Sequence, residues 1–165
     1  FPRFEFFEGP EDDVLARYAE ATAKYAPDFV VRLTGDCPLL PSYVVTQIVK
    51  MAVTNGYDYC SNVDERFRTS YDGSDCEVIS RRLLEDTAAT ATAAQDREHV
   101  TTAIRRVPPG WAKIGFVCNY LDFSQMKLSV DTPEDLERVR HIYESAQDKY
   151  HRACLTFGKQ AVHRQ

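Results

Sequence analysis

Apolar residues recur along this chain with the periods of strands and helices. A short, nearly continuous apolar run at residues 29–33 is closed by Thr34-Gly35-Asp36, which predicts a strand buried on both faces of a parallel sheet. Apolar residues at positions 44, 45, 48, 49 and 52 then share one helical face, and Asn55-Gly56 ends that helix. The pattern predicts strands that alternate with amphipathic helices.

The other elements follow from the same two periods. Pro10 and the acidic residues after it start a helix that continues to Tyr25. Thr132-Pro133-Glu134-Asp135 starts another, because Thr suits the cap, Pro the first helical position, and an acid follows three residues after the cap. Residues 62–73 are polar and have no clear period, which predicts a loop over a site. Strands are also predicted at residues 4–7, 57–61, 75–79, 111–118 and 127–130, and helices at 80–88 (capped by Ser80), 96–106 and 132–150.

Length and composition limit the class of protein. The 165 residues are 44% hydrophobic, enough for one globular domain at residues 1–150, followed by a tail at 151–165 whose period is too weak to assign. A net charge of -5 without a long basic run argues against nucleic acid as a partner. No apolar stretch approaches a membrane span and no signal core is present, so we expect no membrane partner and a cytoplasmic location. The cysteines form no CxxC pair and indicate neither a zinc site nor a disulfide framework.

Two aspartates occupy equivalent places in the predicted fold. Asp36 follows the strand at 29–33 and Asp131 follows the strand at 127–130, each just before a helix. Ligands of open α/β sheets bind beyond the carboxyl ends of the strands, so both aspartates lie where a metal or substrate would be met. A capping role in the turn to the next helix explains Asp36 equally well.

Four further charged residues are candidates for substrate binding. Asp75 and Glu77 share one face of the predicted strand at 75–79, which suits a cation or a sugar. An exposed edge-strand face explains the same spacing. Arg97 and His99 lie in the first turn of the predicted helix at 96–106, where a surface salt bridge with a capping role is the simpler explanation.

Five blocks of sequence, taken in order, resemble one known family. They are EGPEDDVLARY at residues 8–18, GDCPLL at 35–40, YDGSDCEV at 71–78, REHVT at 97–101 and VDTPEDLERVR at 130–140. Together they resemble the cytidylyltransferases of the spore coat polysaccharide biosynthesis protein F type and, more distantly, those that activate 3-deoxy-manno-octulosonate and acylneuraminates. The resemblance implies a Rossmann-like α/β fold of the nucleotide-diphosphosugar transferase kind, in which helices sandwich a mostly parallel sheet.

The resemblance also implies a reaction and a site. The family joins the CMP part of CTP to a sugar or sugar acid and releases pyrophosphate, with Mg²⁺ held by two aspartates that match Asp36 and Asp131 here. These two are therefore the expected catalytic and metal-binding residues. In-line attack on the α-phosphorus needs a hard cation held by carboxylates and phosphates, which agrees with this assignment. The expected sugar-binding residues are Asp75, Glu77, Arg97 and His99.

One family feature has no match in this chain. Family members begin with a strand and a loop of the form RxGSxRLPGK that wraps the triphosphate, and no such phosphate cradle is found here. We therefore expect an N-terminally truncated chain that carries the metal and sugar side of the enzyme and is inactive alone. The alternative is a non-catalytic sugar or nucleotide-sugar binding module, or a self-associating relic. Loss of the first strands also predicts an exposed edge at residues 29–33, covered in a homodimer by that edge or by the aromatic residues 1–7.

Overall fold

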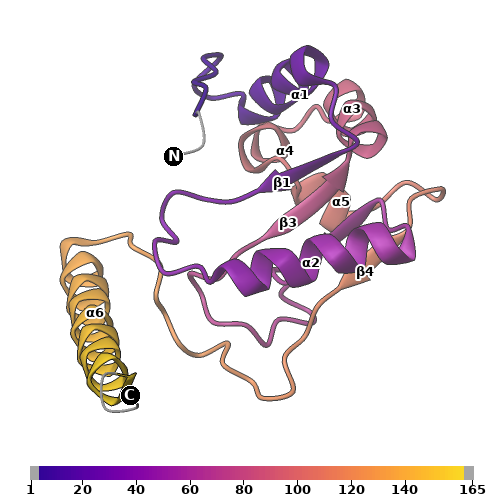
Figure 1. Cartoon of the computed structure of the whole chain (residues 1–165). Helices are drawn as coiled ribbons and strands as arrows, with labels where there is room; N and C mark the ends of the chain where they lie inside the picture. The colour runs from indigo at the N-terminus through magenta and orange to yellow at the C-terminus, as the bar shows by residue number, and fades with distance from the viewer. Residues whose placement is uncertain (1–3, 162–165) are drawn as a thin grey trace.

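The fold is a four-stranded sheet with helices on both faces (Figure 1). The computed structural model describes the backbone of residues 4–161 and the side chains of residues 4–147. Within the described part of the chain, no helix is both long and apolar enough to cross a membrane. The elements in chain order are α1 (Val14–Tyr25), β1 (Phe29–Arg32), α2 (Ser42–Asn55), β2 (Tyr59–Ser61), β3 (Glu77–Ser80), α3 (Arg81–Thr90), α4 (Ala94–His99), α5 (Thr102–Arg106), β4 (Ile114–Phe116) and α6 (Pro133–Ala161).

The sheet is mixed, with strand order β1-β3-β2-β4. β3 lies between β1 and β2 and is antiparallel to both, whereas β2 and β4 are parallel. The α/β class is confirmed, but the expectation of a mostly parallel sheet is wrong. A parallel return needs a long crossover, usually a helix, and the segment between β2 and β3 contains no helix. The chain therefore comes back beside β2 in the opposite direction.

β1 is an edge strand, not a central one. Its partner among the described strands is β3, with Val30 opposite Ile79 and Val31 opposite Val78. As a result Val31 is 39% exposed, and Leu33, just past the strand, is 46% exposed. The prediction of a strand buried on both faces is wrong for this structure, and β1 lies at the edge of the sheet that the described residues form.

Two apolar clusters fill the two faces of the sheet. The neighbours Tyr59 and Cys60 in β2 belong to different clusters, because successive strand side chains point to opposite faces. α2 covers the Cys60 face through Ile48. Leu15 of α1 and Leu83 of α3 pack on the Tyr59 face, and Figure 1 shows α1 and α3 together on the side away from α2. The sheet is thus the middle one of three layers.

Local signals set several helix boundaries as predicted. Ser80 caps α3 by accepting from the Leu83 N–H at 3.3 Å. Gly56 ends α2 with a left-handed φ of 62°. At the start of α6, Asp135 and Thr132 each accept a hydrogen bond from the main-chain N–H of the other, as in a capping box. α6 then continues to Ala161, beyond the predicted end at residue 150.

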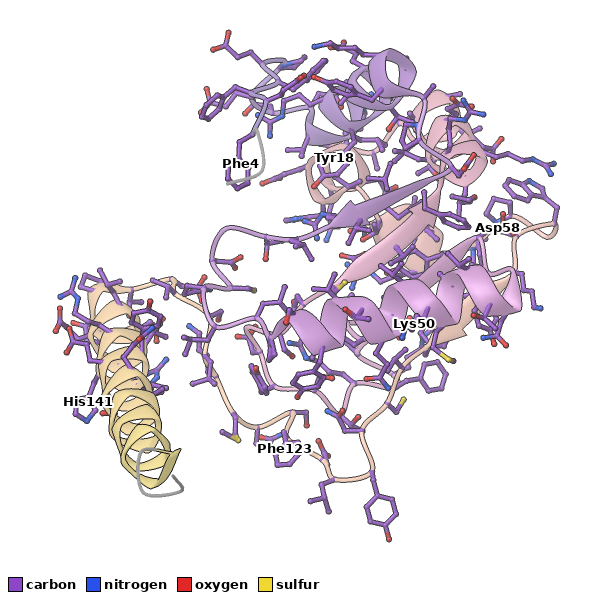
Figure 2. The ribbon with its side chains drawn as sticks, in the orientation of Figure 1. Phe4, Tyr18, Lys50, Asp58, Phe123 and His141 are labelled. Atoms are coloured by element: carbon purple, nitrogen blue, oxygen red, sulfur yellow. The ribbon has the colours of Figure 1, made fainter. Side chains whose placement is uncertain are left out.

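Two predictions near the N-terminus are wrong. Residues 4–7 form no strand, and Phe4 projects from the segment before α1 with 81% exposure (Figure 2). The first helix begins later than Pro10, because the Asp13 side chain accepts from the Ala16 N–H and caps it there. Residues 1–3, part of the aromatic run expected to exchange between chains, lie outside the described residues.

Two later segments also differ from the predictions. The segment 127–130 forms a single parallel bridge between Asp72 and Lys127 instead of a strand. The helix predicted at 96–106 is divided into α4 and α5 by Val100, whose φ of 62° places it in the left-handed region. A continuous right-handed helix excludes that conformation.

Asn62 extends the sheet past the end of β2. Its buried side chain donates to the Ser74 carbonyl at 2.7 Å and accepts from the Cys76 N–H at 3.0 Å. We expect Asn62→Ala to lower the free energy of unfolding by about 2 kcal/mol, because a buried donor and acceptor lose their partner. Asn55→Ala removes an exposed amide and should change it by less than about 0.5 kcal/mol. Urea unfolding compares the two variants, and equal losses would contradict this role of Asn62.

The exposed edge of β1 supports the expected self-association. We predict a two-fold dimer in which the edge that carries Val31 is covered by a second copy. Val31→Lys should then shift the population to monomers, because a charge on an edge strand disfavours further pairing. Val53→Lys, at an exposed apolar position of α2, is the matched control. Light scattering measures the mass, and a wild-type chain that stays monomeric at high concentration would refute the dimer.

Candidate functional site

The loop after β1 presents Asp36 to solvent. The Cys37 N–H donates to the Thr34 carbonyl at 3.3 Å, and Thr34 Oγ1 lies 3.2 Å from Cys37 Sγ, which closes a tight turn. Cys37 is buried, and burial raises the pKa of its thiol, so it anchors the turn as a neutral side chain. Asp36 is thereby held exposed beyond the carboxyl end of β1, where the sequence predicts it.

A main-chain hydrogen bond joins this loop to the loop before α6. The Val130 N–H donates to the Asp36 carbonyl at 2.9 Å, so Asp131 directly follows the point of contact. The Ser129 hydroxyl donates to Asp72 Oδ2 at 2.7 Å and lies 3.4 Å from Asp131 Oδ2. Aspartates from three separate loops are therefore linked at one end of the sheet.

The main chain at Gly73 lies close to the main chain at Leu128 and Ser129, and this makes the linkage between the aspartates possible. A Cβ at Gly73 would lie 2.5 Å from the Leu128 carbonyl carbon, and the residue has a φ of 104°, so a side chain is excluded on both grounds. The Asp72 N–H donates to the Met126 carbonyl at 2.9 Å, and the Leu128 N–H donates to the Asp72 carbonyl at 2.6 Å. The two segments are paired along their main chains, which holds Asp72 against Ser129.

A lysine and a buried carboxylate fix the position of Asp131. Lys127 Nζ lies 2.6 Å from Asp131 Oδ2 and 2.9 Å from Asp135 Oδ2, and these contacts raise the pKa of Lys127. Hydrogen bonds from Lys127 and Arg138 hold the pKa of Asp135 well below its ordinary value. Asp135 also accepts from the N–H groups of Asp131 and Thr132, both at 3.1 Å. The main chain at Asp131 is therefore held from two directions.

A cavity of about 560 Å³ lies among residues of β1, the loop after β2, α4 and α5. Its basic lining residues are Arg32, Arg66, His99, Arg105 and Arg106. The rest of the lining consists of Asp64, Glu65, Gln95 and Thr102. Four arginines face two carboxylates, so hydrogen-bond donors dominate this wall.

One of the four predicted sugar-binding residues lines this cavity, and a second is buried behind its wall. His99 lines it directly. Glu77 lies behind the wall at 2% exposure, where it accepts from Arg32 at 2.8 Å and from the Tyr59 hydroxyl at 2.7 Å. Burial raises the pKa of the Tyr59 phenol well above its ordinary value, so the phenol stays protonated and donates. The alternative that Glu77 lies on the exposed face of an edge strand is wrong, because β3 is an interior strand and Glu77 is buried.

The other two predicted sugar-binding residues make contacts outside the cavity lining. Asp75 accepts from Arg68 at 2.7 Å, and burial raises the pKa of Asp75. Arg97 donates to Asp13 at 2.7 Å and to two main-chain carbonyls at the end of α3. These bonds tie α4 to α1 and α3, as the salt-bridge explanation requires, and a sugar-binding role for Asp75 or Arg97 stays a prediction.

Sequence reasoning does not single out two residues that the structure places at these sites. Asp72 belongs to the YDGSDCEV block and so carries a usable signal, which the choice of Asp75 and Glu77 overlooks. Arg105 carries no such signal. Its place at the cavity depends on how α5 packs against the rest of the fold.

The assignment of Mg²⁺ to Asp36 and Asp131 stays a prediction. Among the residues whose side chains are described, no three His, Cys, Asp or Glu side chains form a cluster that could hold a metal by themselves. Magnesium is commonly held by one or two carboxylates, with water and substrate phosphates as the remaining ligands. Asp36 and Asp131 supply oxygen donors of this kind on adjoining loops.

An α/β sheet with aspartates on adjoining loops beyond a strand end is the kind of site at which α/β enzymes hold Mg²⁺ and a phosphorylated ligand. The chain belongs to the cytidylyltransferase family, whose sequence profile matches residues 3–156. The resemblance inferred from the five sequence blocks is thereby confirmed.

Individual relatives agree with this assignment. The chain is 29% identical over 149 residues to the spore coat polysaccharide biosynthesis protein SpsF of Bacillus subtilis, covering 88% of this chain and 60% of the relative. It is 32% identical over 133 residues to an uncharacterized protein of Methanocaldococcus jannaschii, covering 79% and 52%. A solved cytidylyltransferase from Leptospira borgpetersenii superposes with a TM-score of 0.74 at 32% identity, covering 79% of this chain and 55% of that one. The chain thus spans less than two thirds of each of these relatives.

The contact at Gly73 generates a prediction about stability. We expect Gly73→Ala to lower the free energy of unfolding by more than about 2 kcal/mol, because the added methyl meets main-chain atoms and the positive φ disfavours an L residue. Gly110→Ala is the control, since a Cβ there has nothing within 4 Å. That variant should differ from the wild type by less than about 0.5 kcal/mol. Denaturant unfolding measures both, and a fully stable Gly73→Ala variant would show that the close approach is not required.

Proposed function

We propose that this chain is part of an enzyme that uses Mg²⁺ to transfer the cytidylyl group of CTP to a sugar or sugar acid for surface polysaccharide biosynthesis. Membership of the cytidylyltransferase family supports the chemistry, and the name of the relative SpsF supports the biosynthetic role. The observation that carries the proposal is the hydrogen bond from the Val130 N–H to the Asp36 carbonyl. It joins the two loops that bear Asp36 and Asp131.

Asp36 and Asp131 would hold the metal, which when bound neutralises charge on the triphosphate. Lys127 holds the Asp131 carboxylate through its ion pair at 2.6 Å, and Asp135 holds the Asp131 main chain. Lys127 is also partly exposed beside Asp131, so its charge can attract the phosphates. The chain thus orients a carboxylate before the nucleotide arrives, which reduces the ordering needed on binding.

The basic cavity would receive the acceptor. His99 would contact it directly, and Glu77 would act through Arg32, which it holds at the wall. In the reaction, an acceptor hydroxyl oxygen forms a bond to the α-phosphorus, the bond to pyrophosphate breaks, and the hydroxyl proton is lost. Such a displacement requires both substrates to be held in line. The cavity volume of about 560 Å³ suits one small molecule.

A binding module without transfer activity is the second candidate. It is favoured by one observation: the cavity lining includes neither Asp36 nor Asp131, so the cavity is separate from the predicted metal site. Turnover, by contrast, requires a nucleotide site as well as an acceptor site. Binding of the acceptor and transfer from CTP must therefore be measured separately.

The metal assignment is tested first by binding. We expect Asp36→Asn and Asp131→Asn each to weaken Mn²⁺ binding in the presence of CTP by about tenfold or more, because each removes a charged oxygen ligand. Glu85→Gln, which removes an exposed carboxylate of α3, should leave it unchanged. Electron paramagnetic resonance of Mn²⁺ measures free and bound metal. Equal binding by all four proteins would contradict the metal site.

Turnover separates the two candidate functions. Because this chain is expected to be inactive alone, the assay uses the enzyme of which it is proposed to be a part. With CTP, Mg²⁺ and a panel of sugar acids, that enzyme should release pyrophosphate, and either aspartate substitution should reduce the rate by about 10²-fold or more. A complete protein that binds a sugar acid yet releases no pyrophosphate would instead support the binding module.

A further inference from the structure

Lys127 occupies the carboxylate of Asp131, which the proposed function assigns to a metal. Its Nζ lies 2.6 Å from Asp131 Oδ2, and the Ser129 hydroxyl lies 3.4 Å from the same oxygen. The side chains of Lys127 and Asp131 are 43% and 55% exposed, so a ligand can reach both of them. A positive charge of the chain itself is therefore already placed on this oxygen.

The second partner of Lys127, the buried Asp135, does not depend on it. Asp135 Oδ2 lies 2.9 Å from Nζ and also accepts from the N–H groups of Asp131 and Thr132, both at 3.1 Å. Its Oδ1 pairs with Arg138 at 2.6 Å. Asp135 would thus keep one charged partner and two main-chain donors without Lys127. Asp131 would not, because within the described side chains Lys127 is the one cation within 4.0 Å of it.

The main chain holds Lys127 beside Asp131 but leaves its ammonium able to move. Lys127 pairs with Asp72 in a parallel bridge, and the Leu128 N–H donates to the Asp72 carbonyl at 2.6 Å. Beyond this fixed backbone, a lysine side chain is a flexible four-carbon stem that carries a point charge with three rotatable donors. The ammonium can therefore pass from one anionic oxygen to another without a change of backbone.

We propose that Lys127 exchanges partners when the nucleotide binds: its ammonium leaves Asp131 for a phosphate oxygen and so releases the carboxylate to the metal. The metal site in this proposal rests on the proposed function. An ammonium and a divalent cation at one carboxylate repel each other, so the metal binds weakly before the nucleotide. A triphosphate attracts both cations and removes that competition. Lys127 thus couples metal binding to nucleotide binding.

Mn²⁺ binding with and without CTP tests this coupling on the enzyme of which the chain is proposed to be a part. Without CTP, Lys127→Met should bind Mn²⁺ about tenfold more tightly than the wild type, because Asp131 loses its competing cation. With CTP, the variant should bind Mn²⁺ no more tightly than the wild type. The ratio of the two affinities, which measures the coupling, should therefore fall by about tenfold or more. Electron paramagnetic resonance measures free and bound Mn²⁺, with a protein-free control for Mn²⁺ held by CTP alone.

Three variants separate this role from a general effect of charge. Arg138→Gln removes a cation that contacts Asp135 and not Asp131, so it should change the affinity for Mn²⁺ by less than about threefold. Lys50→Met, which removes an exposed charge of α2, should leave the affinity unchanged. Lys127→Arg keeps a cation beside Asp131 and should keep the weak binding of the wild type. Circular dichroism checks the fold of each variant, and Lys127→Gln provides a second neutral substitution.

Five outcomes would overturn the proposal. They are no effect of CTP on the affinity of the wild type for Mn²⁺, no gain in affinity in Lys127→Met without CTP, an unchanged coupling ratio in that variant, an equal gain in Arg138→Gln, and loss of the fold in both neutral variants of Lys127.

Asp131→Asn distinguishes failure of this proposal from failure of the metal assignment. If Asp131→Asn leaves Mn²⁺ binding unchanged with CTP, the metal assignment fails and the partner exchange fails with it. If Asp131→Asn weakens binding but Lys127→Met does not tighten it, the partner exchange alone fails.

Discussion

The buried carboxylate of Glu77 is the constraint on which the centre of this structure depends. A charge in the middle of a sheet is costly unless it is paired and hydrogen-bonded, and β3 places Glu77 between two other strands. Arg32, directly opposite on β1, and Tyr59 on β2 provide the two partners. A shift of register by one residue would turn these side chains to opposite faces and leave the carboxylate unpaired. The pairing therefore helps to fix how the three strands align.

The same interaction connects the core with the cavity. Arg32 donates to no other carboxylate among the described side chains, and Glu77 holds it at the cavity wall. The protonated Tyr59 hydroxyl satisfies the second oxygen of Glu77, so this acid is unavailable to Arg105. Because the other lining acids are bonded or exposed, one positive charge is left without a partner in the wall. The charge of the cavity wall thus depends on which ion pairs the fold completes.

The loops that bear Asp36, Asp72 and Asp131 are held by a different kind of interaction. Their positions are set by main-chain hydrogen bonds between segments far apart in sequence, and Gly73 permits the closest of these approaches. These main-chain hydrogen bonds fix the backbone from which each aspartate side chain extends. Lys127 then limits repulsion around Asp131 and Asp135 by pairing with both. A rigid backbone frame with exposed carboxylate tips suits a metal that also takes ligands from a nucleotide.

The sequence by itself determines the features that depend on neighbouring residues. These are the α/β class, the caps at Ser80 and Thr132, and the position of Asp36 just after a strand. The ordered motifs likewise identify the family. Local periodicity and capping residues suffice for them, because the interactions lie within one or two turns of chain.

Only the tertiary structure decides the direction of β3, the edge position of β1 and the division of the 96–106 helix at Val100. It also decides that Asp72 lies against Ser129 and that Arg105, alone among the arginines of the cavity wall, has no partner among the described side chains. The physical reason is that strand pairing and charge pairing depend on groups distant in sequence. Whether an arginine is neutralised is determined by which carboxylates the folded chain brings within reach, and no local pattern records that.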